Sequence, residues 1–154
     1  MSGLSFREAR PADLPAIVAM ISQDTIPAGR ETNADDPCYA AAFAAIDADP
    51  NQQLIVGELD GRIVAKLQLT FVPGLSFRGA WRGLIEAVRV ASDCRGQRIG
   101  EALMAEAVAR CRARGCTMAQ LTSDKSRTRA HAFYERLGWT PSHIGFKLRL
   151  EVPV

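Results

Sequence analysis

The sequence predicts a mixed α/β (α+β) fold with one central sheet, and three observations support this. Two apolar runs enclose Asp60-Gly61, a strong signal for a two-residue β-hairpin turn. A strand pattern ends at Val90 and leads, through a glycine-containing turn, into the apolar-striped run Glu101–Arg112. Helical and strand patterns then alternate along the rest of the chain. The expected element order is β-α-α-β-β-β-α-β-α-β.

Length and composition suggest one ordinary domain covering 1–154. The chain has 154 residues, with 47% hydrophobic and 23% charged residues, close to an average globular protein. The net charge of +2 is too small to favour nucleic acid. Aromatic residues make up 6% and do not alternate with basic clusters, so we expect no nucleic-acid partner.

The four cysteines and the apolar pattern bear on the compartment. Cys38, Cys94, Cys111 and Cys116 form no C-x-x-C pair, so we expect no metal site and reduced thiols, as in a cytoplasmic protein. No run of 18 apolar residues occurs, and the N-terminus lacks an apolar signal core. We therefore expect neither a membrane span nor membrane binding.

The first third of the chain predicts one strand and two helices. Leu4–Ala9 alternates like a strand, and Asp13 is suited to cap a helix with an apolar stripe over Leu14–Ile21. A loop is expected at Pro27–Arg30. A second, alanine-rich helix is expected over Asp35–Asp47, with Pro37 tolerated in its first turn.

The middle of the chain predicts three strands, and the last third completes the order. The strands cover Gln53–Leu59, Ile63–Val72 and Gly83–Val90, with Pro73-Gly74 breaking the second. The long helix after Gly100 ends at Arg114-Gly115. The remaining elements are a strand at Met118–Thr122, a helix at Arg127–Leu137 closed by Gly138, and a last strand at Phe146–Leu150.

The turn Arg95–Gly100 carries the strongest functional signal. A turn that feeds a helix presents free backbone N–H groups where the helix dipole is positive, which favours an anion such as phosphate. The Gly-x-Gly-x-x-Gly spacing of dinucleotide sites and the P-loop pattern are both absent. The turn by itself leaves two interpretations: an ordinary surface turn, or a cradle for the pyrophosphate of coenzyme A.

Two motifs together resemble those of the GNAT acyltransferase superfamily. Arg95-Gly96-Gln97-Arg98-Ile99-Gly100 resembles its Arg/Gln-x-x-Gly-x-Gly/Ala motif. About 30 residues later, Ala130–Trp139 is similar to its Ala-x-x-Phe-Tyr-x-x-x-Gly-Phe/Trp signature. The resemblance implies a mixed, mostly antiparallel sheet of six to seven strands flanked by about four helices. It also implies an N-acetyltransferase that uses acetyl-CoA and a primary amine of a small molecule, peptide or protein.

The resemblance further implies where acetyl-CoA binds. Its pantetheine arm would pair with a strand edge exposed where two strands splay apart, and its pyrophosphate would lie on the turn. The residues implied are Ala87, Val88, Arg89, Val90, Arg95, Gly96, Gln97, Arg98, Ile99, Gly100, Glu101, Arg127 and Tyr134.

Two of these residues depart from the family pattern. Arg98 replaces a glycine, and we expect it to keep an ordinary helical φ with its side chain in solvent or on a phosphate. Arg127 stands where many relatives carry an asparagine that contacts the pantetheine arm.

Two residues are candidates for the acid–base chemistry. Tyr134 matches the family tyrosine near the coenzyme sulfur and would protonate the leaving thiolate, although it could simply be an aromatic packing residue. Glu86, among apolar neighbours, would act as base if poorly solvated, or else face solvent or pair with Arg82 or Arg89. The backbone N–H of Val88 is the candidate oxyanion donor.

Other polar residues have weaker claims to a role. His131 and His143 could serve the acceptor amine but fit surface positions equally well, and Cys94 is a bystander in a mechanism that needs no thiol. Four acidic residues around the second helix are expected to be helix-end charges in solvent: Asp35, Asp36, Asp47 and Asp49.

The acceptor, the oligomeric state and two other functions stay open. Loops at Thr25–Ala34 and Pro73–Gly79 are expected to line the acceptor pocket, and the strand at Phe146–Leu150 could pair two copies in a homodimer. The alternatives to an enzyme are a non-catalytic acyl-CoA sensor and a structural subunit.

Overall fold

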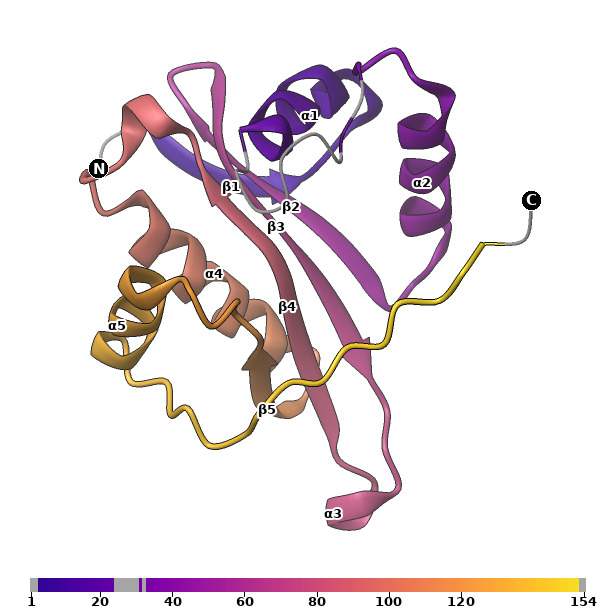
Figure 1. Cartoon of the computed structure of the whole chain (residues 1–154), viewed down its shortest axis with the longest axis vertical. Helices are drawn as coiled ribbons and strands as arrows, with labels where there is room; N and C mark the ends of the chain where they lie inside the picture. The colour runs from indigo at the N-terminus through magenta and orange to yellow at the C-terminus, as the bar shows by residue number, and fades with distance from the viewer. Residues whose placement is uncertain (1–2, 24–30, 32, 153–154) are drawn as a thin grey trace. The chain divides into compact units, whose positions relative to one another are not determined.

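The computed structural model describes residues 3–23, 31 and 33–152 (Figure 1). The chain divides into two compact units, Met1–Leu121 and Thr122–Val154, and each is described by itself. The first unit contains the sheet and most of the helices. The loop expected at residues 27–30 lies outside the described residues, as does most of the loop expected at 25–34.

The first unit is built on a five-stranded sheet. Its strands are β1 (Leu4–Glu8), β2 (Gln52–Leu59), β3 (Arg62–Val72), β4 (Trp81–Val90) and β5 (Cys116–Leu121), and they lie side by side in chain order. Strands β1 to β4 pair antiparallel, and β5 runs parallel to β4. The β2–β3 turn is the predicted hairpin, because Asp60 and Gly61 both have positive φ, 50° and 81°.

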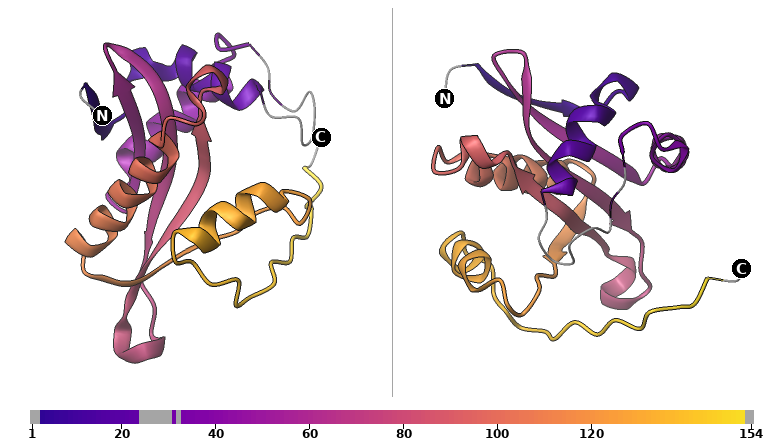
Figure 2. Two further views of the ribbon diagram at one scale, coloured as in Figure 1. Left: turned by 90° about the vertical axis from the view of Figure 1, so that its left-hand side faces the viewer. Right: turned by 45° about the horizontal axis from the view of Figure 1, so that its top comes forward.

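Helices cover both faces of this sheet. The first unit contains α1 (Leu14–Ser22), α2 (Pro37–Ala48), the short α3 (Ser76–Gly79) and α4 (Ile99–Ala113). Helices α1 and α2 lie on one face of the sheet and α4 on the other (Figures 1 and 2). The second unit contains α5 (Thr128–Arg136). These positions confirm the mixed α/β fold and the four longer helices expected from the sequence.

The core of the first unit forms where α4 packs on the central strands. The largest fully buried side chains come from β2, β3, β4 and α4: Phe71, Ile55, Leu67, Leu69, Ile85, Ile99, Leu103, Met104, Val56 and Val64. Burial of this apolar surface is the main term that favours folding. It also holds α4, and therefore the turn that precedes α4, against the sheet.

Helix α4 approaches β4 most closely at Gly83. A Cβ atom at this position would overlap the sulfur of Cys111, which lies on α4 and is buried. Burial raises the pKa of the Cys111 thiol, so the group stays neutral and packs as a small apolar side chain. The absence of a side chain at Gly83 therefore sets the distance between α4 and the sheet.

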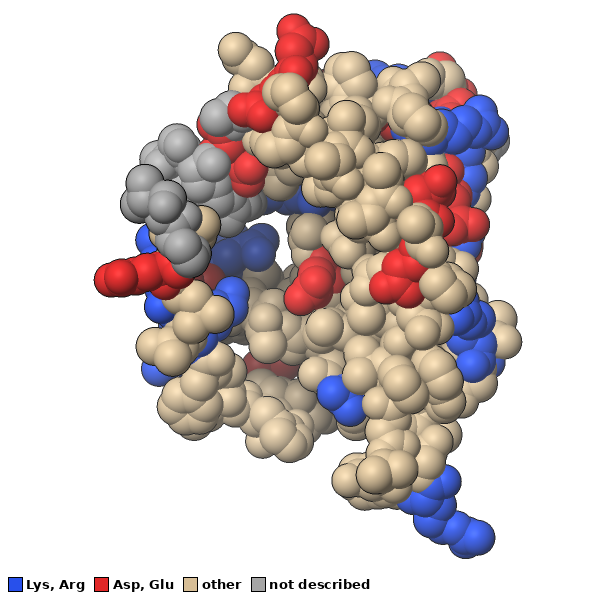
Figure 3. Space-filling view, turned by 90° about the vertical axis from the view of Figure 1, so that its right-hand side faces the viewer, with Lys and Arg blue, Asp and Glu red and all other residues tan. Residues whose placement is uncertain are grey.

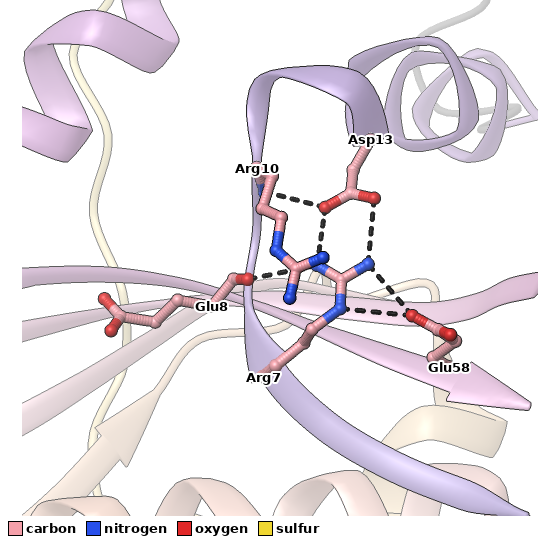
Figure 4. A network of polar contacts seen from close by, with 5 residues as sticks. All are labelled: Arg7, Glu8, Arg10, Asp13 and Glu58. Carbon is pink, nitrogen blue, oxygen red and sulfur yellow. Dashed lines mark hydrogen bonds and ion pairs between the residues drawn. The ribbon is translucent and has the colours of Figure 1, made fainter. Parts of the chain in front are cut away.

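A partly buried ion-pair network joins β1, β2 and the start of α1 (Figure 4). Arg7 donates two hydrogen bonds to the carboxylate of Asp13, at 2.7 and 3.0 Å, and two to Glu58, at 3.1 and 2.9 Å. Asp13 also accepts the backbone N–H of Arg10 at 2.7 Å and is 9% exposed. Asp13 occupies the predicted N-cap position of α1, but its carboxylate bonds Arg7 and the backbone N–H of Arg10 and none of the N–H groups of α1.

The second helix begins with the local chemistry that its sequence indicates. Pro37 occupies its first position, where no N–H is needed, and the carboxylate of Asp36 accepts the backbone N–H of Cys38 at 2.9 Å. Asp36 is therefore a helix cap. Asp35 lies just before this helix, and Asp47 lies in its last turn.

The last predicted strand is absent from the described chain. Residues 146–150 form no strand, and the sheet has five strands where six to seven were expected. A strand needs a hydrogen-bonded neighbour, and none is found for this segment among the residues that the structure describes. Phe146, Leu148 and Leu150 are at least 76% exposed.

Charges on the surface are mixed in sign. Figure 3 shows acidic and basic side chains interspersed over one face, in keeping with the net charge of +2. Among the residues that the structure describes, no helix is long and apolar enough to cross a bilayer.

We predict that Asp13→Asn lowers the free energy of unfolding at pH 7 by about 1–3 kcal/mol, because it leaves Arg7 partly buried without its main anionic partner. The hydrogen bonds from Arg7 are the main cause that lowers the pKa of Asp13. A lowered pKa in the folded state gives stability that is present above about pH 4 and lost as pH falls further.

Urea titrations from pH 7 to pH 3 measure both effects. The wild-type chain should lose stability below about pH 4, and Asp13→Asn should lose less over the same range. Asp47→Asn, at the exposed end of α2, is the matched control and should change stability by less than about 0.5 kcal/mol. Equal acid sensitivity of wild type and Asp13→Asn would contradict the assignment.

We also predict that Gly83→Ala lowers the free energy of unfolding by about 1–3 kcal/mol, because the new methyl group meets the Cys111 sulfur. Cys111→Ala alone should cost about 1–2 kcal/mol through the space it leaves. The double variant should recover part of the loss from Gly83→Ala, since one methyl group then occupies space vacated by the sulfur. A double-mutant cycle by urea unfolding measures this coupling, and strict additivity would show that the two residues are not in contact.

Candidate functional site: an open strand edge and an anion-binding turn

The site begins where β4 and β5 separate. The two strands pair in parallel from Trp81 opposite Cys116 to Ile85 opposite Leu121, and β5 ends there. Strand β4 continues to Val90, and on its other side it stays paired with β3 through Lys66 opposite Arg89 and Ala65 opposite Val90. Among the residues that the structure describes, Ala87–Val90 therefore have no strand on the β5 side. The splay predicted from the sequence is present in the first unit.

A β-bulge lies within this open stretch. Gln68 faces Glu86 and Lys66 faces Arg89, so Leu67 on β3 faces two residues of β4, Ala87 and Val88. Ala87 has φ of 55°, in the left-handed region, which costs about 1–2 kcal/mol for a residue with a Cβ. The bulge bends β4 and re-aims its backbone groups at the point where the neighbouring strand ends.

The turn after β4 has the geometry of an anion site. A short 3-10 turn, Ser92–Cys94, leads into Arg95, and Gly96 and Arg98 both have left-handed backbones with φ of 82° and 61°. Helix α4 begins at Ile99 with no side-chain cap, and its first i→i−4 bond runs from Ala102 N–H to Arg98 C=O. Within the described part of the chain, no partner is found for the backbone N–H groups of residues 95–101. These free amides and the positive end of the α4 dipole favour a bound anion.

Arg98 differs from expectation in its backbone. We expected an ordinary helical φ, but the residue adopts the left-handed conformation that a glycine at this position would adopt with less strain. Its side chain is 82% exposed, as expected, and its Nε donates to Glu101 at 3.1 Å. The left-handed backbone at Arg98 therefore leads into α4, and the guanidinium pairs with Glu101 in the first turn of that helix.

Two contacts hold this strained turn in place. Cys94 and Ile99, on either side of it, are 5% and 1% exposed and anchor it to the core. Arg62, at the start of β3, donates two hydrogen bonds of 2.8 Å to the carboxylate of Asp93. These bonds lower the pKa of Asp93 and raise that of Arg62. The buried position of Cys94 fits a packing role.

Glu86 lies at the point where β4 becomes unpaired, but it is exposed. It sits opposite Gln68 of β3, whose amide bonds Gln52 at 2.9 Å. The poorly solvated setting considered for Glu86 is therefore absent in this structure. The role of Glu86 as general base stays a prediction.

The second signature lies in the second unit, on and around α5. Tyr134 is half-buried, and its ring meets Phe133 and Trp139 edge-on with centroids 5.2 and 6.4 Å away. Burial is the main cause that raises the pKa of the Tyr134 phenol above its ordinary value of 10, and the charge of Arg127 acts in the opposite direction. The phenol is therefore protonated at neutral pH and able to donate a proton.

The two histidines also lie in the second unit. One ring nitrogen of His131 lies 2.8 Å from the carbonyl oxygen of Asp124, and His143 Nδ1 lies 2.7 Å from the hydroxyl of Ser142. Both contacts are local, which fits surface positions. The roles of Tyr134 in acid catalysis and of Arg127 in coenzyme binding stay predictions.

No metal-binding cluster is found in the described residues: nowhere do three or more His, Cys, Asp or Glu side chains come together as ligands.

The sequence analysis did not predict two features of the site. Ala87 gave no signal, because alanine does not favour a left-handed backbone. Gly83 within an apolar strand was a readable sign of close backbone approach, and Cys111 is the group that approaches it.

The open strand and the turn with free amides define the class of protein: an α/β fold with a strand edge suited to an extended ligand and a helix N-terminus suited to an anion. A family model described as the acetyltransferase (GNAT) family matches residues 18–139. The chain therefore belongs to this family and is an N-acetyltransferase.

Three individual proteins are similar to this chain, and two of them carry acetyltransferase names. The chain is 29% identical over 140 residues to an aminoalkylphosphonate N-acetyltransferase of Salmonella typhimurium, covering 91% of this chain and 87% of that protein. It is 42% identical to the crystal structure of a transcriptional regulator from Bacillus halodurans C-125, with a TM-score of 0.90 over 96% of this chain and 99% of that one. A proposed acetyltransferase from Agrobacterium tumefaciens is 29% identical, with a TM-score of 0.85 over 95% and 99% of the two chains.

We predict that Ala87→Gly raises the free energy of unfolding or leaves it unchanged, within about 0–1 kcal/mol, because glycine adopts the left-handed backbone without strain. Alanine-to-glycine changes in strands normally destabilise. Ala119→Gly in β5 is the matched control and should lower stability by about 0.5–1 kcal/mol. Urea unfolding of both variants measures the difference, and equal losses would mean that Ala87 is not held at positive φ.

Proposed function

We propose that this chain transfers an acetyl group from acetyl-CoA to the primary amine of a small molecule, by direct attack of the amine in a ternary complex. The observation that carries the proposal is the unpaired edge of β4 followed directly by the free amides of residues 95–101. This arrangement suits a ligand that is extended at one end and carries a pyrophosphate at the other. Membership of the acetyltransferase family supports the same donor.

The donor is proposed to bind along both features at once. Ala87–Val90 would pair with the amide groups of the pantetheine arm, as an added strand does. The amides of Arg95–Glu101 would hold the pyrophosphate, and the exposed guanidinium of Arg98 would exchange Glu101 for a phosphate oxygen. Arg127 would contact the arm from the second unit.

The chemistry is proposed to need one base, one oxyanion donor and one acid. The amine nitrogen attacks the thioester carbonyl and loses a proton to Glu86, directly or through water. The backbone N–H of Val88 would stabilise the oxyanion. The C–S bond then breaks, and the thiolate takes the proton of Tyr134, whose raised pKa keeps that proton available. Solvent returns a proton to the phenolate.

The acceptor class rests on the relative from Salmonella typhimurium, whose name states that it acetylates aminoalkylphosphonates. Small primary amines that carry an anionic group are therefore the first acceptors to test, ahead of peptide amines. The proposal treats residues 1–154 as one acetyltransferase domain that works in the cytoplasm. The four cysteines, free in the structure, support a reducing compartment.

A thiol-release assay over a panel of aminoalkylphosphonates, other small amines and peptides tests the activity, with the acetylated product identified by mass. A thermal shift with acetyl-CoA tests binding separately. Binding without transfer to any amine would favour the non-catalytic sensor. The absence of both would favour the structural subunit.

We predict that Tyr134→Phe lowers kcat by about 10²–10⁴-fold, the usual contribution of a general acid, while the thermal shift with acetyl-CoA is retained. The chain has one other tyrosine, Tyr39 on α2, so Tyr39→Phe is the matched control and should keep kcat. Unchanged kcat in Tyr134→Phe would assign the residue to packing against Phe133 and Trp139.

A further inference from the structure

The two faces of strands β3 and β4 differ in character. The face toward α4 is apolar and belongs to the core, with four side chains that are at most 2% exposed: Leu67, Leu69, Phe71 and Ile85. The opposite face, on the α1 side, carries five polar side chains from the same strands: Lys66, Gln68, Thr70, Glu86 and Arg89. An antiparallel sheet commonly has a polar face where that face meets water.

Water does not account for the most central of these polar residues. Arg7, Val56 and Lys66 are successive partners across β1, β2 and β3, so their side chains lie on the same side of the sheet. Arg7 is directed toward Asp13 at the start of α1, which fixes that side (Figure 4). Lys66 is only 2% exposed there. Its partner on β4, Arg89, continues the row on the same side and is half-buried.

This row places two cations opposite each other. Residues that face each other on antiparallel neighbours have Cβ atoms about 4.5–5.5 Å apart, and like charges in that position repel. Burial of the Lys66 ammonium adds a cost in lost hydration. An anion that contacts both groups offsets both costs, and two cations favour a doubly charged phosphonate or phosphate over a carboxylate. Lys66 and Arg89 also have interactions within the chain, and a bound anion would join or replace these.

A carboxylate lies one step along the same face. Glu86 faces Gln68, which stands two residues from Lys66 on β3, so Glu86 and Lys66 share this side of the sheet. Two residues of strand span about 7 Å. The sheet face therefore presents a negative group and a pair of positive groups about one small molecule apart. This pattern is complementary to an amine that carries an anionic group a few bonds away.

We propose that Lys66 and Arg89 bind the anionic group of the acceptor, a small primary amine that carries a phosphonate or phosphate, while Glu86 faces its amine. This inference rests on the proposed function and names the residues that select the acceptor. The backbone of residues 87–90 would serve acetyl-CoA at the strand edge, and the side chains of Glu86 and Arg89 would serve the acceptor on the sheet face. An anion fixed at this row would hold the amine of a short chain near the proposed oxyanion donor, Val88.

Isothermal titration with methylphosphonate tests the anion site without any need for transfer, because this ligand has no amine. Saturating coenzyme A is added so that the turn at 95–101 is occupied. We expect the wild-type chain to bind methylphosphonate, and Lys66→Met to raise the Kd by about 10–100-fold through loss of a charge-assisted hydrogen bond. Lys125→Met, the same change at an exposed lysine, is the matched control and should leave the Kd unchanged.

A second variant and a folding check accompany this titration. Arg89→Gln should also raise the Kd for methylphosphonate, and it tests the site independently if Lys66→Met fails to fold. Thermal unfolding of each variant shows whether it is folded. We expect Lys66→Met to fold, because methionine is close to lysine in length and removes a buried charge.

Kinetics with three amines of equal chain length test selection of the acceptor: an aminoalkylphosphonate, an aminocarboxylate and an uncharged alkylamine. The wild-type chain should prefer the aminoalkylphosphonate in kcat/KM by roughly 100-fold over the alkylamine. Lys66→Met should raise the KM for the aminoalkylphosphonate by about 10–100-fold with a smaller change in kcat. Lys66→Arg keeps the charge and should restore part of the preference. A structural role alone would instead lower turnover of all three amines alike.

The outcomes separate this anion site from the proposed function. Absence of methylphosphonate binding to the wild-type chain, or unchanged binding in both Lys66→Met and Arg89→Gln, would overturn the anion site whatever the transfer assay shows. Transfer without preference for the anionic amines would also overturn it and leave the acetyltransferase activity standing. Binding of methylphosphonate through Lys66 without acetylation of any amine would support the anion site and count against the proposed reaction.

Discussion

The site depends on one constraint: β4 keeps its β3 partner along its whole length but loses β5 after Ile85. Backbone N–H and C=O groups need partners, so a strand that is paired on one side only presents a binding edge. The bulge at Ala87 falls within this half-paired stretch and bends it. The next residues form the turn and begin α4, so the edge and the free amides are joined by only a few residues.

Strain in this region is offset by packing outside it. Ala87 and Arg98 both have left-handed backbones, which the chain would leave if nothing held them. Buried Cys94 and Ile99 hold the turn, and Gly83 lets α4 pack closely on β4 through Cys111. A fixed backbone would favour the proposed binding of a phosphate, because amides that are already in position need no rearrangement when it binds. Helix α4 therefore contributes both to the core and to the turn that precedes it.

The two edge strands of the sheet differ in charge. Strand β1 is charged and tied to α1 through Arg7 and Asp13, whereas β5 is uncharged and open.

The amino-acid sequence by itself determined the positions of the four longer helices and the paired strands, the Asp60-Gly61 hairpin, and the turn before α4, because periodicity, capping and turn chemistry act over a few neighbouring residues. It also identified Tyr134 and Glu86 as candidates, through a motif for the first and a lone carboxylate for the second. Only the tertiary structure decided that Ala87 and Arg98 have left-handed backbones, that Asp13 forms an ion pair with Arg7, and that Glu86 is exposed. It also left Phe146–Leu150 unpaired. These outcomes depend on contacts between residues far apart in the chain, which no local pattern encodes.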